Sequence, residues 1–267
     1  MRIEKAYKEI FIFVAGTTPQ IITETICALS QKTIPIYPDE IFIITTLTGK
    51  RFIEKQLLDS GILSEMMLEL GLPQIPITEG SFVVPKGANN FEIDDIRSEE
   101  ENELMGNLIT SLVRDKSNDP SSRLHCSIAG GRKTMSFYLG AALQLFGRPQ
   151  DKLYHVLVTP EFELNPSFFY KPKKNRIIQG RGIDGKPKQL NTKNANIELA
   201  ELPFIRLSGK ISFQGKDFRE LVLEGQRTID LAMVQPELVV NLLERYIQIG
   251  DTIIEMLPIQ LMFYTAF

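Results

Sequence analysis

The sequence predicts an α/β protein with a doubly wound, mostly parallel sheet of the Rossmann-like class. Three observations support this prediction. Short apolar runs, typical of strands covered on both faces, recur along residues 8–160. Helical patterns separate these runs, so that strand and helix alternate as in parallel sheets with crossover helices. The composition, with 43% apolar and 24% charged residues among 267, is that of a globular protein with a sizeable core.

The elements of this sheet follow in order along the chain. The first expected strand, residues 10–16, leads into a helix with Thr18 as its N-cap and Pro19 in its first turn. The second strand, residues 41–46, leads through Thr48 into a helix that ends near residue 60. The later expected elements are a helix at 65–70, a third strand at 74–78, a helix at 98–114, a fourth strand at 124–129, a helix at 132–146 and a fifth strand at 152–159.

Three regions are expected. Residues 1–165 form the sheet domain, residues 166–200 a basic loop or linker, and residues 201–267 a smaller, mainly helical C-terminal region. Between Lys171 and Lys193, eight basic residues stand against one acid, Asp184. This segment is interpreted either as a solvated loop or as a flexible basic arm over a polyanionic ligand.

The C-terminal region begins with helical patterns at 217–232 and 236–245. A hairpin is then expected at 246–255, turning at Gly250-Asp251, and a helix from Pro258 that is apolar on nearly every side. The hairpin and this helix resemble the opening of a winged-helix domain of the response-regulator type. We therefore expect either that the chain is a truncated form of a longer, DNA-binding protein or that this helix packs on the sheet domain or across a dimer. An ordinary terminal helix buried on its own domain is the simpler alternative. The packing of four side chains decides between them: Leu261, Phe263, Tyr264 and Phe267.

Charge and cysteine usage limit the function classes. The net charge is −3, so any polyanion site must be local. No apolar stretch reaches the ~20 residues needed to cross a bilayer, and the first residues do not form a signal peptide. We expect a cytoplasmic protein with no membrane partner. Cys27 and Cys126 lack the spacing of a zinc site or a disulfide framework, so they are expected in the core, and no metal or cofactor is expected.

An anion site is expected where the fourth strand meets its helix, at Gly130-Gly131-Arg132-Lys133-Thr134. Two glycines let backbone amides approach a phosphate, the helix N-terminus adds partial positive charge, and Arg132 and Lys133 add full charges. A tight turn alone is the simpler alternative. A Walker A loop is excluded because Arg132 and Ser127 occupy its glycine positions, and the one glycine near residue 16 does not make a dinucleotide fingerprint.

Neutral hydrogen-bonding side chains follow the first two strands. With the strand order 3-2-1-4-5, the first and fourth strands are neighbours, and ligands bind at such a switch point. Hydroxyls there suit ribose and base edges, although helix capping is the alternative for each single threonine. These side chains are Thr17, Thr18, Gln20, Thr46 and Thr48, and Gly16 is expected to contact the ligand from the same loop.

Other titratable residues are given structural roles. His125 and His155 fall in expected strands without an acid or serine in a triad-like relation, so packed histidines are expected. The acidic stretch, which contains Asp94, Asp95, Glu99, Glu100, Glu101 and Glu103, is interpreted as a solvated face or loop.

Two segments, VAGTTPQ (residues 14–20) and SIAGGRKTM (residues 127–135), resemble the two nucleotide-contacting loops of the CARF (CRISPR-associated Rossmann fold) family. The similarity is greatest to the small CARF proteins that accompany type III CRISPR systems. It covers about residues 8–160 and is weaker from Pro203 onward. The resemblance implies a homodimer with one symmetric pocket for a cyclic oligoadenylate, the second messenger of the type III interference complex. Some members cleave this messenger without metal as ring nucleases, and others only sense it.

The leading hypothesis is a protein that binds cyclic tetra-adenylate and cleaves it as a metal-independent ring nuclease. Lys133 and Arg132 would hold the phosphate charge, Thr17, Thr18 and Gln20 would orient ribose, and Thr46 or Thr48 would contact adenine or a second phosphate. Lys133, Arg132 and Thr18 are the catalytic candidates.

Two alternatives remain open. The first is a non-catalytic sensor with a C-terminal DNA-binding domain. The second is a mononucleotide-binding enzyme outside CRISPR biology. A fused HEPN ribonuclease is not favoured, because its R-x-x-x-x-H signature is missing from the C-terminal part; after Arg245, for example, Gly250 stands where the histidine should be.

Overall fold

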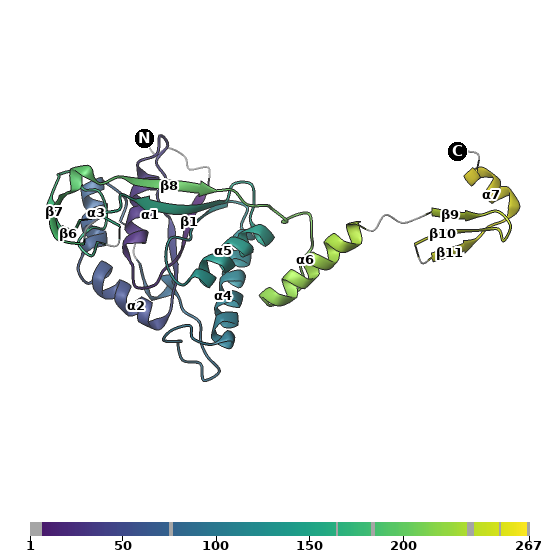
Figure 1. The fold of residues 1–267 in the computed structure, drawn as a ribbon, viewed down its shortest axis with the longest axis horizontal. Coiled ribbons are helices and arrows are strands. Elements are labelled where there is room, and N and C mark those ends of the chain that lie inside the picture. The colour runs from purple at the N-terminus through teal and green to yellow at the C-terminus, as the bar shows by residue number, and fades with distance from the viewer. Residues whose placement is uncertain are drawn as a thin grey trace. The chain divides into compact units, whose positions relative to one another are not determined.

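The computed structural model describes residues 7–74, 77–163, 165–182, 185–233, 238–250 and 252–265. The chain divides into two compact units, residues 1–218 and 219–267. In the first unit a six-stranded sheet has the order β3-β2-β1-β4-β5-β8, which includes the expected order 3-2-1-4-5 (Figure 1). The strands are β1 (Lys8–Val14), β2 (Glu40–Ile44), β3 (Phe82–Val83), β4 (Ser122–Ser127), β5 (Lys152–Val158) and β8 (Ile197–Leu202).

All strand pairs of this sheet are parallel except the last, in which β8 runs antiparallel to β5. The helices of the first unit cover both faces, with α1 and α3 on one side and α4 and α5 on the other (Figure 1). The predicted doubly wound α/β class is therefore confirmed. The helices are α1 (Gln20–Ser30), α2 (Leu47–Ile53) with a π-helical extension (Glu54–Leu58), α3 (Ile62–Leu70), α4 (Glu99–Ser117) and α5 (Lys133–Phe146).

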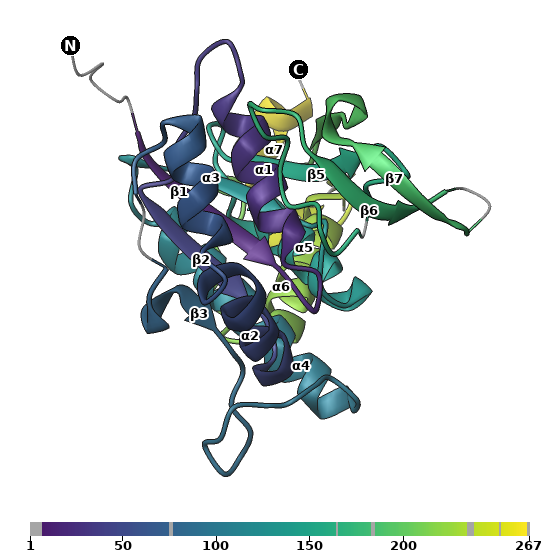
Figure 2. The ribbon, with the colours of Figure 1, turned by 90° about the vertical axis from the view of Figure 1, so that its left-hand side faces the viewer.

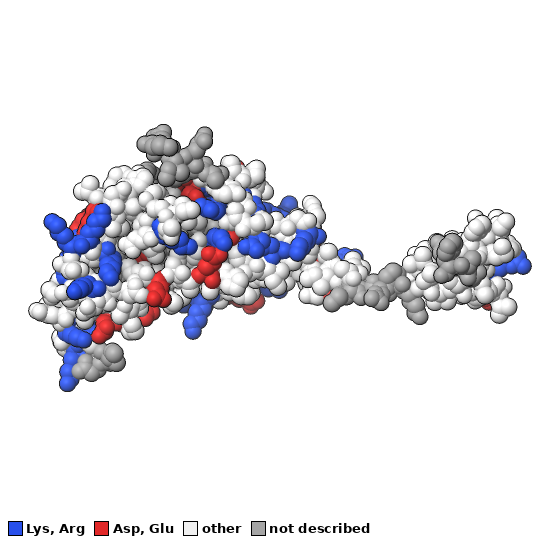
Figure 3. Space-filling model, turned by 90° about the horizontal axis from the view of Figure 1, so that it is seen from above, with Lys and Arg blue, Asp and Glu red and all other residues white. Residues whose placement is uncertain are grey.

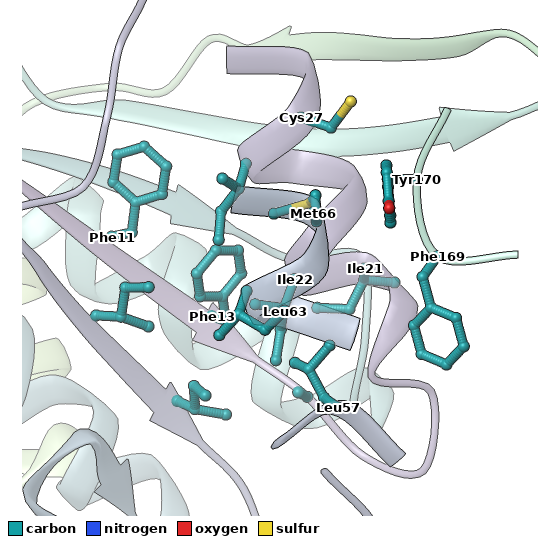
Figure 4. Close-up of a cluster of buried hydrophobic side chains, with 14 of the residues drawn as sticks. Phe11, Phe13, Ile21, Ile22, Cys27, Leu57, Leu63, Met66, Phe169 and Tyr170 are labelled. Carbon is teal, nitrogen blue, oxygen red and sulfur yellow. The ribbon is translucent and has the colours of Figure 1, made fainter. Parts of the chain in front are cut away.

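Strand β1 lies at the centre of the core because its side chains alternate between two apolar clusters. Phe11 and Phe13 point to the face that carries α1 and α3, where they pack with Ile22 and Met66 (Figure 4). The intervening side chains, such as Ile12, join the cluster under α4 and α5. A strand with both faces covered has to be apolar throughout, which explains the run IFIFV.

Two local predictions for the sheet domain are wrong. The third strand is Phe82–Val83, not residues 74–78; Ile75 and Pro76 lie outside the described residues, and the others of that stretch are not in a strand. The N-cap of α1 is Pro19 and not Thr18, and it makes no side-chain capping bond. Thr18 is therefore free of a capping role.

The basic segment contains a pair of strands, with irregular chain before them. Strands β6 (Ile177–Arg181) and β7 (Pro187–Asn191) pair in antiparallel fashion (Figure 2). A small cluster of Phe162, Phe168, Leu190 and Ala195 packs at its base. The segment before β6 is held to α3 by a hydrogen bond from the Tyr170 hydroxyl to the Glu69 carboxylate at 2.8 Å.

The second unit comprises most of α6 (Phe218–Met233), an antiparallel sheet in the order β11-β10-β9, and α7 (Pro258–Thr265). Strands β10 (Tyr246–Ile249) and β11 (Thr252–Glu255) pair in antiparallel fashion, as the expected hairpin requires; Asp251 of the expected turn lies outside the described residues. The expected helix at 236–245 is wrong, because β9 (Leu238–Asn241) occupies its described part.

The four side chains expected to show how the terminal helix packs do not give a uniform answer. In α7 the side chain of Leu261 is buried and that of Phe263 is exposed; the side chains of Tyr264 and Phe267 lie outside the described residues. In the described part of the chain, no helix combines the length and apolarity that a membrane crossing requires.

Candidate functional site at the switch point of the sheet

The two loops singled out in the sequence meet at the carboxyl edge of the sheet. Strands β1 and β4 are parallel neighbours, with Phe13 opposite Ser127 at their ends. Beyond them the backbones of Gly16 and Gly131 touch, since a Cβ added to Gly16 would lie 3.4 Å from the Gly131 Cα. The predicted switch point is therefore where these loops converge.

Both glycines of the β4–α5 turn are required by geometry. Gly131 has a φ of +72°, in the left-handed region that disfavours residues with a Cβ. A Cβ on Gly130 would come within 2.9 Å of the Val14 carbonyl oxygen. The hydroxyl of Ser136 donates to the Ile128 carbonyl at 3.0 Å and fixes the same turn from inside α5.

A pocket of about 280 Å³ opens between these loops and the start of α2. Most of the expected binding residues line it. Its lining is Ala15, Gly16, Thr17, Thr18, Thr46, Thr48, Gly49, Asp95, Gly131, Arg132 and Met135. The structure thus brings together seven residues that the sequence assigned to binding; their binding roles remain a prediction.

The other four expected binding residues lie outside this lining. Gln20 is buried, and its Nε2 lies 3.5 Å from the Asn165 carbonyl oxygen, so it joins the segment after β5 to α1. Gly130 packs behind the loop. Lys133 and Thr134 are exposed on the first turn of α5, at the rim of the site.

The start of α2 packs closely against the β1–α1 loop. Thr46 is the N-cap of α2, and its Oγ1 accepts from the Gly49 N–H at 3.3 Å. A Cβ on Gly49 would lie 3.3 Å from the Gly16 carbonyl oxygen and would collide with the Thr45 hydroxyl. Glycine at position 49 therefore permits the close approach that forms one wall of the pocket.

Asp95 is the charged residue among the four lining residues that sequence reasoning missed; the other three are Ala15, Gly49 and Met135. It forms a two-point ion pair with Arg132, with Nε–Oδ1 at 2.9 Å and Nη2–Oδ2 at 2.5 Å. The Arg132 guanidinium lowers the pKa of Asp95 to about 2, helped by the Ile96 N–H. Asp95 belonged to a stretch interpreted as a solvated acidic face, and no spacing in the sequence distinguishes it from its acidic neighbours.

The uncompensated positive charge at the site comes from Lys133 and from α5. Among the described residues, Lys133 has no ion pair, and its ammonium group stands at the first turn of a 14-residue helix. On the face of the first unit seen in Figure 3, basic and acidic side chains are interspersed. Attraction for an anion is therefore local to the α5 N-terminus, consistent with the small net charge of −3.

Cation-binding chemistry has few candidates in this pocket. Asp95 is the one carboxylate in the lining described above, and it is engaged by Arg132. Within the described ranges, no group of three or more His, Cys, Asp or Glu side chains gathers as a metal site.

A second polar cluster lies at the opposite edge of the sheet. The Glu9 carboxylate binds His125 Nε2 at 2.7 Å and Arg123 Nε at 3.0 Å, and Tyr154 OH lies 3.3 Å from His125 Nδ1. His125 is buried, as expected for a packed histidine. Burial is the main cause that lowers the pKa of His125, so the imidazole is neutral at pH 7.

Comparison with known families gives a match over most of the chain. The family model described as CRISPR-associated protein NE0113 matches residues 18–230, about four fifths of the chain. The match begins in the β1–α1 loop and includes both the start of α2 and the β4–α5 turn. No curated protein matched the sequence. The chain therefore belongs to the CRISPR-associated protein NE0113 family.

Proposed function

We propose that the switch-point pocket binds a cyclic oligoadenylate, in the manner of CARF proteins, and that the ligand is cyclic tetra-adenylate. One observation carries this proposal: in a chain of a CRISPR-associated family, a glycine turn at a helix N-terminus and a set of threonine hydroxyls line one pocket. The turn suits a phosphate, and the hydroxyls of Thr17, Thr18, Thr46 and Thr48 suit ribose and base edges.

The size of the pocket supports a shared site in a homodimer. Its volume of about 280 Å³ is at the lower limit of the roughly 300–1,000 Å³ of small-molecule pockets. A ring of four nucleotides is larger than the ligands of such pockets, so one pocket would hold only part of it. Two copies related by a two-fold axis would present the same loops to both halves of a symmetric ring.

Cleavage of the ring needs positioning and charge stabilisation. The ribose 2′-oxygen attacks the adjacent phosphorus, the bond to the 5′-oxygen breaks, the 2′-hydroxyl loses its proton and the 5′-oxygen gains one. The products are a 2′,3′-cyclic phosphate and a 5′-hydroxyl. Lys133 and Arg132 would stabilise the charge that develops on the phosphate, and Thr18 would orient the ribose. We infer ring nuclease activity on this basis.

A sensor without catalysis is the second candidate, because residues 219–267 form a separate compact unit that could transmit ligand binding. DNA is a poor partner for that unit. It contains three arginines and seven acids, a net charge of −4, whereas binding to phosphate backbones requires clustered basic residues. The charge of residues 219–267 therefore favours a sensor that acts through a partner other than a phosphate backbone.

The deciding experiment incubates labelled cyclic tetra-adenylate and cyclic hexa-adenylate with the full chain in EDTA. We expect binding of the tetra-adenylate and products that end in 2′,3′-cyclic phosphate. Binding without turnover would favour the sensor. Loss of cleavage on chelation, restored by manganese, would contradict the metal-free mechanism, and failure of both rings to bind would contradict the proposal as a whole.

A further inference from the structure

Asp95 is held at the rim of the pocket by its neighbours in the chain. The adjoining carbonyl groups cap the start of α2: the Leu47 N–H donates to the Ile93 carbonyl at 2.9 Å, and the Thr48 N–H donates to the Asp94 carbonyl at 3.2 Å. On the other side, the Ile96 side chain is buried in the cluster under α4 and α5. The backbone that carries Asp95 is therefore anchored on both sides of the residue.

The carboxylate of Asp95 is saturated with hydrogen bonds. Oδ1 accepts from the Ile96 N–H at 2.8 Å and from Arg132 Nε at 2.9 Å. Oδ2 accepts from Arg132 Nη2 at 2.5 Å and from Arg97 Nε at 3.3 Å. A carboxylate offers about four acceptor positions, and all are used here. Asp95 therefore has no acceptor position left for a ligand hydroxyl or amine.

The Arg132 guanidinium is fixed by this contact and still has donors to offer. Of its five N–H groups, Nε–H and one on Nη2 point to Asp95, which leaves three. Arg132 lines the pocket, and half of its side-chain surface is exposed. A planar group held at two points presents its remaining donors in one orientation, which lowers the entropy lost on binding.

We propose that Asp95 is a positioning residue that orients the Arg132 guanidinium toward a phosphate of the bound ring. The inference rests on the proposed function, because it assumes an anionic ligand in this pocket. Asp95 and Arg132 largely neutralise each other, so Arg132 supplies directed hydrogen bonds. Positive charge nearby comes from Lys133, from the α5 N-terminus and from Arg97, which also contacts Asp95. The backbone on both sides of Asp95 is held in place, at Ile93, Asp94 and Ile96. Such anchoring is expected of a carboxylate that orients Arg132, and it would serve no purpose in one that only competes with the ligand for Arg132.

Two measurements test this role, one of them without ligand. In ¹⁵N-resolved NMR spectra of the ligand-free protein, the Arg132 Nε–H should give a slowly exchanging signal, assigned by its loss in Arg132→Gln. In Asp95→Asn this signal should exchange rapidly. Asp94→Asn is the matched control, since Asp94 is an exposed neighbour whose side chain lies outside the pocket lining and is 75% exposed. An unchanged Arg132 signal in Asp95→Asn would overturn the positioning role.

The second measurement is a double-mutant cycle with cyclic tetra-adenylate. We expect Asp95→Asn to weaken binding at least about fivefold in the wild-type background and to have no further effect in Arg132→Gln, because coupled residues are not additive. Tighter binding in Asp95→Asn would mean that Asp95 only repels the ligand and would overturn the inference. Equal weakening in both backgrounds would mean a general effect on the loop and would also overturn it.

The two arms separate this inference from the proposed function. If the wild-type protein binds no cyclic tetra-adenylate, the proposed function is wrong. The claim that Arg132 is oriented toward a phosphate of that ring is then wrong as well. The NMR measurement still decides whether Asp95 orients Arg132. If the ring binds and the cycle shows no coupling, the proposed function stands and the positioning role is wrong.

Discussion

The two edges of the central sheet use polar residues in opposite ways. At the amino edge, Asp151 is fully buried and accepts from the Leu124 N–H, from the Arg148 N–H and from the Arg148 guanidinium at 2.8–2.9 Å. Glu9, Arg123 and His125 form a second closed network beside it. At the carboxyl edge, Lys133 is exposed without an ion pair among the described residues, and the backbone at Gly131 is left-handed.

This difference indicates which edge is built for stability and which is available to a ligand. A buried charge costs free energy unless it is paired and hydrogen-bonded, so the amino edge can be polar only because its groups satisfy one another. At the carboxyl edge, the Lys133 ammonium group is exposed and Arg132 keeps N–H donors that Asp95 does not use, so both can bind a ligand. Substitutions at the two edges should therefore separate into effects on stability and effects on binding.

The largest effect is expected at the amino edge. Asp151→Ala removes the acceptor of the Leu124 and Arg148 backbone N–H groups. It also removes the carboxylate that faces the Arg148 guanidinium, which keeps neutral acceptors at the Asp119 carbonyl and the Ser122 hydroxyl. The free energy of unfolding should therefore fall by about 3–5 kcal/mol. Urea denaturation followed by circular dichroism would measure it. Exposed Asp59→Ala, in the turn after α2, is the control and should change little. A loss below 1 kcal/mol would mean that the network does not stabilise this edge.

The next effect is expected at the carboxyl edge. Lys133→Ala should weaken cyclic tetra-adenylate binding by at least about 1.5 kcal/mol, roughly tenfold, because charge-assisted contacts to a phosphate contribute about that much. The free energy of unfolding should be unchanged, since the side chain is exposed. Titration calorimetry measures the affinity, with exposed Lys55→Ala as the control. Unchanged affinity would remove the first turn of α5 from the site.

Assembly offers a third test of the same edge. If one pocket holds only part of a ring, the protein should be a dimer that binds one ring per two chains. Light scattering gives the mass with and without cyclic tetra-adenylate, and calorimetry gives the stoichiometry. A monomer under both conditions would contradict the shared site, even if each chain bound a ring.

The sequence was sufficient for features that depend on local patterns. The apolar runs predicted strands β1, β2, β4 and β5. With the common order of a doubly wound sheet, they also predicted the meeting of the Gly16 and Gly131 loops. These features follow from strand burial and from positions where only glycine fits. The mixed polar and apolar hairpin of β6 and β7 was missed, because its strands depend on tertiary packing of Leu190 with Phe162 and Phe168.

Two further features could not be predicted locally. In β9, Val239 and Val240 favour a strand, but the sequence around them also fits a weak helical pattern, so local pattern does not decide between the two. The partnership of Asp95 and Arg132 joins residues 37 positions apart and depends on the path of the chain between β3 and α4. Charges of this kind can be assigned partners only when the fold is known.

The smallest effect is the pH dependence of the amino edge. Burial raises the pKa of Glu9, but hydrogen bonds from His125 and Arg123 outweigh burial and leave that pKa below its ordinary value. Burial lowers the pKa of His125. Both groups therefore bind fewer protons in the folded state than in the unfolded chain, so stability should be lost as the pH falls: first below about 6.5, where unfolded histidine titrates, and then below about 4.3, where unfolded glutamate titrates.

His125→Gln isolates the first of these two steps. The variant should be less stable than the wild type at pH 7, because the Glu9 contact is weakened, yet its free energy of unfolding should change less between pH 7 and pH 5.5. Urea denaturation at several pH values measures this slope, and His155→Gln, which replaces the other histidine of the chain, is the control. If the free energy of unfolding depends equally on pH in the wild type and in His125→Gln, burial does not keep His125 neutral. The view that the polar groups of the amino edge satisfy one another without gaining protons would then be wrong.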